Sequence, residues 1–195
     1  MESKVEDTFT RALTAHKAAL ATFEETGAQI VERISTRITD CFRNGGCLYL
    51  CGNGGSAADS QHIAGELVGR FRRTRRPLPA VALTTDPSVL TCIGNDYRYD
   101  DIFARQVEAL ATAKDVLWAF STSGTSANIL AAVDVARENG AQVIAFTGTP
   151  ANPLEARADV CLCARTAATN VAQEIHQLAY HIICELIDQH FSDGP

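Results

Sequence analysis

Short apolar runs alternate with longer amphipathic stretches along most of the chain. Each of the five runs has four to six residues, and each is bounded by Gly, Pro, Asp or Asn. Strands that are apolar at nearly every position are typical of parallel sheets whose two faces are both covered by helices. The pattern therefore predicts an α/β fold with a doubly wound, five-stranded parallel sheet. Its strands are expected at residues 47–51, 80–84, 116–121, 142–147 and 160–163.

The stretches between the runs carry apolar residues at three- and four-residue spacing, which is the period of an amphipathic helix. Residues 5–44 show the same spacing and are interpreted as two helices, because a turn signal lies near Gly27 and Asn44–Gly46 ends the second. The helices that cover the sheet are expected at residues 56–70, 86–94, 100–112, 126–139 and 168–191.

The N-terminal helical segment has no strand of its own to cover. A helical extension of this kind often packs against another subunit, so we expect an oligomer. The length of 195 residues suits one domain, and no repeat, low-complexity tract or linker divides the chain. We therefore predict a single domain over residues 1–195, with helices at 1–44 that pack in the oligomer and an α/β core at 45–195.

Composition and charge narrow the class of protein. The chain is 46% hydrophobic and 21% charged, and its net charge is −6. A net negative charge argues against nucleic-acid binding, because contact with a phosphate backbone needs a basic surface. No apolar run approaches the roughly 18 residues of a membrane-spanning helix, and the first residues lack a secretory signal. We expect a cytoplasmic protein that binds neither membrane nor nucleic acid.

The pattern does not favour a functional role for most of the cysteines and arginines. The seven cysteines are odd in number and contain no CxxC pair, so they are interpreted as reduced thiols that pack like small apolar side chains. Five arginines lie between residues 70 and 76. They are interpreted as a solvated helix end and loop, with only a weak substrate role for Arg70.

Two loops carry the groups that bind small anions. Gly52–Ser56 runs from the first strand directly into a helix, and its glycines allow backbone N–H groups to approach a ligand. Phe120–Ser126 follows another strand and offers the hydroxyls of Ser121, Thr122, Ser123 and Ser126. Helix capping explains one such hydroxyl but not four. Because ligands bind beyond the carboxyl ends of parallel strands, the two loops predict a phosphate ester site.

Two predicted helices carry candidate metal ligands. His62 and Glu66 are four residues apart, so they lie on one helix face and offer half of a zinc-type ligand set. In the last helix, Gln173 and His181 are about 12 Å apart along the axis, and Gln177 with His181 is an equally plausible pair from geometry. Spacing alone leaves this choice open.

Four segments occur together in one order: Gly52–Glu66, Gly94–Tyr97, Ser121–Ser126 and Gln173–His176. In this order they resemble the phosphoheptose isomerases, which are sugar isomerase (SIS) domain proteins, and the resemblance covers nearly the whole chain. It implies a flavodoxin-like SIS form of the predicted sheet. It also implies a homotetramer whose active sites are shared between subunits.

The resemblance further implies one zinc ion per subunit, held by His62, Glu66, Gln173 and His181, and it thereby selects among the alternatives in the last helix. It also implies that both loops and the Asn-Asp pair contact a phosphorylated heptose. The expected substrate contacts are Asn53, Gly54, Gly55, Ser56, Glu66, Asn95, Asp96, Ser121, Thr122, Ser123, Ser126 and Gln173.

Members of this family convert D-sedoheptulose 7-phosphate to D-glycero-D-manno-heptose 7-phosphate, for nucleotide-activated heptose synthesis. The reaction moves a proton between C1 and C2 through an enediol. In this hypothesis Glu66 is the base for the carbon proton, His181 is its acid–base partner, and zinc stabilises the enediol as a Lewis acid. The chain departs from many family members at Asn170 and at Val171-Ala172, directly before Gln173.

Two alternatives share parts of these motifs. A related branch of the family binds the replication initiator DnaA as a non-catalytic tetrameric adaptor, but the complete set of four metal ligands favours the enzyme. Other phosphosugar isomerases, such as those acting on arabinose 5-phosphate, usually carry an extra regulatory domain for which this chain has no room.

Overall fold

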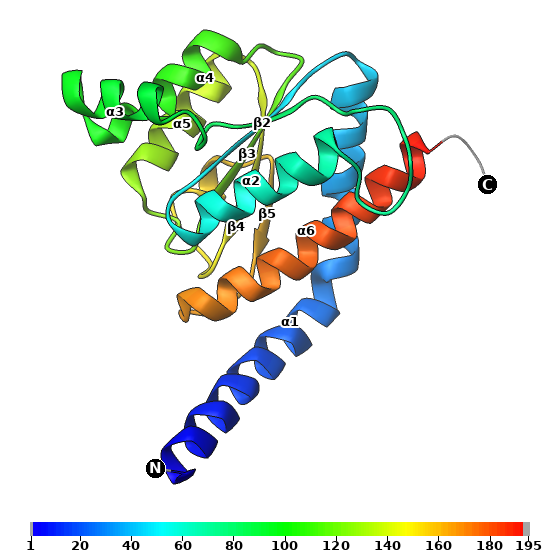
Figure 1. Cartoon of the computed structure of the whole chain (residues 1–195), viewed down its shortest axis with the longest axis vertical. Coiled ribbons are helices and arrows are strands. Elements are labelled where there is room, and N and C mark those ends of the chain that lie inside the picture. Colours follow the sequence, from blue (N-terminus) through cyan, green and yellow to red (C-terminus); the bar gives the residue numbers. More distant parts are fainter. Residues whose placement is uncertain (1, 193–195) are drawn as a thin grey trace.

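The structure is a computed structural model that describes residues 2–192. Its five strands are all parallel and follow the order β2-β1-β3-β4-β5 (Figure 1). The doubly wound sheet predicted from the apolar runs is therefore confirmed, and the last three strands have the predicted bounds. The strands are β1 (Leu48–Gly52), β2 (Ala80–Ala82), β3 (Val116–Ser121), β4 (Gln142–Thr147) and β5 (Val160–Cys163).

The strand order creates a point where the chain changes direction across the sheet. From β1 the chain moves to β2 on one side, whereas β3, β4 and β5 follow on the other side. Gly52 pairs with Phe120, so the loops after β1 and β3 leave the sheet side by side. In open α/β sheets of this order, ligands bind at this switch point, beyond the carboxyl ends of the strands.

Six α-helices accompany the sheet within the described residues, and alternation along the strands assigns them to its two faces. Leu48 and Leu50 point to the face covered by α1, α2 and α6, and Tyr49 and Cys51 point to the face covered by α3, α4 and α5 (Figure 1). The helices are α1 (Glu2–Arg43), α2 (Gly55–Val68), α3 (Pro87–Asp96), α4 (Ala104–Leu110), α5 (Ala127–Glu138) and α6 (Thr169–Phe191). The segment predicted as one helix at 100–112 is a 3₁₀ turn, Tyr99–Asp101, followed by α4.

The prediction of two N-terminal helices is wrong, because α1 is one helix of 42 residues. A single glycine inside a helix costs only about 1 kcal/mol relative to alanine, and no proline accompanies Gly27 to break the helix. The second half of α1 packs against the sheet through Ile34 and Ile38, which are fully buried. Residues 3–15 are exposed, and this part projects away from the sheet (Figure 1).

The cysteines are free thiols, as predicted. Cys41, Cys51 and Cys184 are buried, and Cys92 is exposed. Burial raises the pKa of Cys51 to about 12. The buried thiols are therefore protonated at neutral pH and contribute as small apolar side chains.

A buried ion pair joins the end of α2 to the end of α6. Arg75 Nε donates to Asp188 Oδ1 at 2.7 Å, and the side chains are 0% and 1% exposed. The other Arg75 nitrogens donate to the carbonyls of Glu66 and Leu67, both at 2.8 Å. Asp188 Oδ2 accepts the backbone N–H groups of Arg72–Arg73 at 2.8 and 3.0 Å. The pair is thus surrounded by hydrogen bonds that satisfy both charges.

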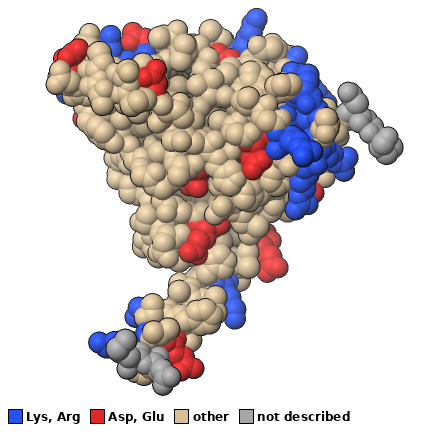
Figure 2. All heavy atoms as spheres, in the orientation of Figure 1, with Lys and Arg blue, Asp and Glu red and all other residues tan. Residues whose placement is uncertain are grey.

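Arg75 corrects the interpretation of residues 70–76 as a wholly solvated segment. The exposed arginines of this segment contribute to the basic edge of the face shown in Figure 2, beside the end of α6. Arg75 instead points inward. Local sequence does not predict this, because the partner Asp188 is more than a hundred residues away.

We expect Asp188→Ala to lower the free energy of unfolding by about 3–5 kcal/mol, because it leaves the buried Arg75 guanidinium without its counter-charge. Denaturant unfolding at fixed protein concentration measures the change. Asp134→Ala is the control, since Asp134 pairs with Arg157 at 2.9 Å at the surface, where an ion pair contributes at most about 1 kcal/mol. Equal losses in the two variants would contradict a special role for the buried pair.

The same pair predicts a pH dependence. Burial alone would raise the pKa of Asp188, but the N–H groups of Arg73 and Arg72 and the Arg75 side chain outweigh it and hold the pKa below its usual value. The stabilisation is therefore complete above the pKa of aspartate in the unfolded chain and is lost as the pH falls through the lower, folded pKa. The stability difference between the wild type and Asp188→Ala should shrink in acid.

Candidate active site

The loop after β1 turns sharply at Gly54 and opens α2. Gly54 has φ 56° and ψ −120°, a conformation that L side chains rarely adopt. The turn brings the N-terminus of α2 to the carboxyl edge of the sheet, where its N–H groups and the helix dipole favour an anion.

The loop after β3 gathers hydroxyl groups at the same edge. Ser121 Oγ lies 3.0 Å from Ser126 Oγ and 3.4 Å from Ser123 Oγ, and it accepts the Gly124 N–H at 3.1 Å. Gly124 has φ 66°, which closes the loop tightly. The hydroxyls therefore form one cluster ahead of the N-terminus of α5.

A reciprocal amide pair ties the two loops together. Asn53 Nδ2 donates to Asn128 Oδ1 at 2.9 Å, and Asn128 Nδ2 donates to Asn53 Oδ1 at 2.8 Å. Tyr99 also donates its hydroxyl to Asn53 Oδ1 at 3.2 Å. Asn128 is 2% exposed and was missed by the sequence analysis, although an amide side chain in the first turn after Ser126 was an available signal. Because its carbonyl oxygen is already shared, Asn53 has mainly its backbone to offer a ligand.

Between the loops lies a cavity of about 270 Å³. Gln173 enters it from α6, and a Cβ placed on Gly55 would lie 2.5 Å from Gln173 Nε2. Glycine at position 55 therefore makes room for this amide. The residues that line the cavity are Asn53, Gly54, Gly55, Ser56, Phe120, Ser121, Thr122, Ser126, Thr169 and Gln173.

Eight of the predicted substrate contacts thus surround one cavity. Asn95 lines a neighbouring cavity of about 550 Å³ that shares Asn53 and Gly54 with the first. Asp96 accepts a hydrogen bond from Asn95 at 2.8 Å and is not among the lining residues of either cavity, and neither is Ser123. Thr169 and Tyr99, which the sequence analysis did not select, complete the walls.

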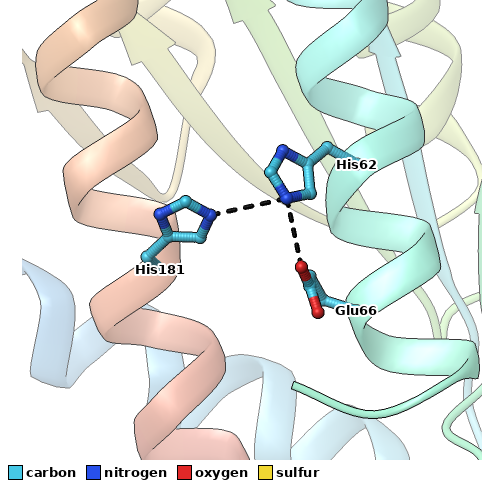
Figure 3. A group of neighbouring side chains, drawn as sticks. All are labelled: His62, Glu66 and His181. Carbon is cyan, nitrogen blue, oxygen red and sulfur yellow. Dashed lines mark hydrogen bonds and ion pairs between the residues drawn. The ribbon is translucent and has the colours of Figure 1, made fainter. Parts of the chain in front are cut away.

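Three candidate metal ligands converge between α2 and α6 (Figure 3). His62 Nε2 lies 3.1 Å from Glu66 Oε1 and 3.5 Å from His181 Nε2, and one ligand atom from each residue lies within 4.8 Å of the others. His181 therefore joins the pair on α2, which the spacing along the sequence could not decide. The role of Gln173 as a fourth ligand stays a prediction.

The chemistry of this cluster fits a divalent metal ion. Two imidazole Nε2 atoms face each other beside a carboxylate oxygen, so one ion placed among them would satisfy all three groups. Burial, and then the nearby His62, lower the pKa of His181, which favours the neutral imidazole that binds metals. Three nitrogen and oxygen ligands would leave room for a further ligand on zinc.

Two residues behind the cluster were missed from sequence. The Tyr180 hydroxyl lies 3.0 Å from His62 Nδ1 and 3.4 Å from Asp59 Oδ1. Burial, and then the Asp59 carboxylate, raise the pKa of the Tyr180 phenol, so it keeps its proton at neutral pH. Tyr180 lies in the apolar stripe of α6, and its neighbour His181 was the only available hint.

The cavity and the metal cluster lie at two places along the same helix pair. Gly55 and Gln173 meet at the cavity, and His62 and His181 meet at the cluster. At 1.5 Å per residue, the two contacts are about 10 Å apart along α2 and about 12 Å apart along α6. The distance between the two contacts is similar on α2 and on α6, so the two helices run side by side in the same direction.

Comparisons with known proteins identify the family of this chain. Residues 13–148 match the family model of the SIS domain. A phosphoheptose isomerase of Roseiflexus sp. (strain RS-1) is 50% identical over 165 residues, covering 85% of this chain and 84% of that protein. The solved phosphoheptose isomerase GmhA from Neisseria gonorrhoeae is 40% identical with a TM-score of 0.85, covering 96% of this chain and 99% of that chain. That from Francisella tularensis is 33% identical with a TM-score of 0.85, covering 97% and 98%.

We expect zinc to raise the melting temperature of metal-stripped protein by roughly 5–10 °C when its free concentration is about 100 times the dissociation constant. His181→Ala should abolish most of this shift, because it removes one of three converging ligands. His16→Ala is the control, since His16 pairs with Glu174 at 2.7 Å at the surface, outside the cluster. Thermal unfolding with and without zinc measures the effect. A full shift in His181→Ala would exclude the cluster as the zinc site.

Proposed function

The chain belongs to the SIS domain family, among the phosphoheptose isomerases, and we propose that it converts D-sedoheptulose 7-phosphate to D-glycero-D-manno-heptose 7-phosphate with one zinc ion per subunit. Its general activity as a sugar-phosphate isomerase follows from the family. The particular heptose, the metal and a role in nucleotide-activated heptose synthesis are the proposed part.

The spacing between the cavity and the metal cluster carries the proposal. The seryl hydroxyls and helix N-termini suit a phosphate group, and the cluster about 10–12 Å away along the helices suits the reacting end of the sugar. From phosphorus to C2, an extended heptose 7-phosphate spans roughly 9 Å, because each bond of about 1.5 Å advances the chain by about 1.3 Å. A pentose 5-phosphate is shorter by about 2.5 Å, so this spacing favours the longer substrate.

Glu66 is our proposed base for the carbon proton. Its Oε1 faces His62 at 3.1 Å, and no hydrogen bond within residues 2–192 involves its Oε2. Oε2 is therefore the atom available to take a proton from C1 and to return one to C2. Glu66 is 21% exposed at its side chain, so it is accessible from the solvent side of the cluster.

His181 is the proposed partner that moves the proton between the two sugar oxygens. Its lowered pKa favours the neutral ring, whose Nε2 would accept a proton from the C1 hydroxyl, as the C2 carbonyl becomes a hydroxyl, while it is released from the metal. Zinc held by His62, Glu66 and His181 would supply Lewis-acid stabilisation of the negative charge that develops on these oxygens.

The exposed part of α1 supports a homotetramer with active sites that neighbouring subunits share. Val5, Phe9 and Leu13 recur every four residues and are 70%, 62% and 41% exposed. A second apolar surface lines a groove of about 770 Å³ between α1 and α6, which includes Leu178 and Ile182. Apolar stripes of this kind on a long helix are typical of helix–helix interfaces.

None of the helices within residues 2–192 combines the length and hydropathy required to cross a membrane. The cytoplasmic location remains a proposal drawn from the sequence. The non-catalytic adaptor that binds DnaA gains no support here, because the relatives reported above are phosphoheptose isomerases.

The test of function is turnover of sedoheptulose 7-phosphate, followed by NMR with and without a zinc chelator. We expect the aldose product to appear, to cease with chelator and to return with added zinc. Arabinose 5-phosphate should turn over at least ten times more slowly at equal concentration. Turnover that persists after the metal is removed would contradict the zinc assignment, and a metal-free tetramer that captures DnaA would support the adaptor instead.

Glu66→Gln should keep the fold and the affinity for substrate but lose turnover by about 10²–10⁴-fold, the usual contribution of a general base. Equilibrium binding of the substrate and the unfolding transition control for indirect effects. Near-wild-type turnover in this variant would remove Glu66 from the reaction.

Assembly should depend on the exposed stripe of α1. We expect Phe9→Asp to convert the tetramer to smaller species in sedimentation experiments, because it places a charge in an apolar contact. Arg11→Ala changes the net charge by the same amount on the opposite face of the helix and should leave the assembly intact. A tetramer in both variants would show that this stripe is not the interface.

A further inference from the structure

His62 presents its two ring nitrogens to different surroundings. Nε2 faces Glu66 and His181 across the proposed zinc site (Figure 3). Nδ1 faces away from that site and lies 3.0 Å from the hydroxyl of Tyr180. Only one tautomer leaves a lone pair on Nε2 for a metal, and in it the hydrogen is on Nδ1.

Tyr180 is placed to form a hydrogen bond whose direction depends on the tautomer of His62. It is 0% exposed, and its hydroxyl oxygen also lies 3.4 Å from Asp59 Oδ1. Its ring packs edge-on against His62 at 5.5 Å and against His181 at 4.8 Å between ring centres. One buried side chain of α6 therefore contacts both histidines of the cluster, one from each helix.

Asp59 completes the arrangement from α2. Its Oδ2 is buried, and within the described chain no hydrogen bond satisfies it. A buried carboxylate oxygen without a donor is costly and rare, so it calls for an explanation. Three residues before His62 on the same helix, Asp59 can direct the Tyr180 hydrogen toward itself.

The number of available hydrogens determines which group donates in each hydrogen bond of this arrangement. The phenol has a single hydrogen, and if it donates to Asp59 Oδ1, the Tyr180 oxygen is free to accept the hydrogen of His62 Nδ1. The opposite tautomer would place lone pairs on both His62 Nδ1 and the Tyr180 oxygen, unless the phenol gave up its bond to Asp59.

We propose that Asp59 and Tyr180 form a positioning chain that holds His62 with its hydrogen on Nδ1 and its Nε2 lone pair directed at the metal. The inference rests on the zinc site of the proposed function. It adds two residues that contact no ligand and act through His62. Carboxylates linked to metal-binding histidines orient the ring and raise its basicity, and here a tyrosine from the opposite helix stands between the two.

The chain also couples the two helices that carry the ligands. Asp59 and His62 belong to α2, whereas Tyr180 belongs to α6. The buried pair of Arg75 and Asp188 joins the same helices near their other ends. The metal ligands therefore lie between two polar connections, both largely shielded from water.

The test is zinc affinity, measured by competition with a chromophoric chelator on metal-stripped protein. Tyr180→Phe removes only the hydroxyl and should weaken zinc binding by about 10–100-fold, the usual effect of losing such a partner. Tyr49→Phe is the matched control, because it removes a tyrosine hydroxyl that donates to Leu110 O at 3.2 Å, outside the cluster. Its zinc affinity should equal that of the wild type.

A second variant tests whether the two residues act as one unit. Asp59→Asn should weaken zinc binding, and the double variant with Tyr180→Phe should lose little beyond Tyr180→Phe alone, because residues in one chain are not additive. Zinc affinity of Tyr180→Phe within twofold of the wild type, or fully additive losses, would overturn the chain.

Rescue by excess metal separates positioning from a direct role in the reaction. Turnover of Tyr180→Phe should recover when zinc is raised to saturate the weakened site. Turnover that stays lost at saturating zinc would place Tyr180 on the substrate and overturn the inference. Failure of the wild type to bind zinc would instead refute the zinc site itself, so the two failures are distinguishable.

Discussion

The contact between α2 and α6 is the interaction on which the site depends. Gly55 admits Gln173 at one point of this contact, and His62 meets His181 at another. Near its end, Arg75 of the loop after α2 bonds both Asp188 of α6 and the last carbonyls of α2. A shift of one helix along the other by a single turn, about 5.4 Å, would separate all of these pairs together. The positions of the candidate metal ligands and of the cavity between the loops therefore depend on the same helix packing.

The sheet supplies the second constraint, because its switch point brings two loops to one place. The loops differ in chemistry, with glycine and backbone donors after β1 and hydroxyl groups after β3. Neither contributes a lysine or arginine, so an anion there would be held by hydrogen bonds and helix termini. Such a site would hold an anion through several directed hydrogen bonds and not through an ion pair.

The sequence predicted the parts of the fold that depend on local pattern and missed those that depend on distant partners. The strands at 116–121, 142–147 and 160–163 were correct, because short apolar runs with clear boundaries leave few alternatives. The break near Gly27 was wrong, because tertiary packing outweighs a small helix penalty. Arg75, Asn128 and Tyr180 were not identified, since each acquires its role from a residue 75 to 121 positions away. His181 was a candidate from its place in the last helix, the family resemblance selected it as a ligand, and the structure brings it to His62.

The exposed first part of α1 has a consequence for how this protein folds. Residues 3–15 make no buried contact within the described chain, and helices of that length are marginal in water without a partner. In the proposed tetramer, burial against a neighbouring subunit would stabilise this part of α1, so its helix formation would be coupled to assembly. Dilution below the dissociation constant of that tetramer would then favour fraying of the first turns of α1.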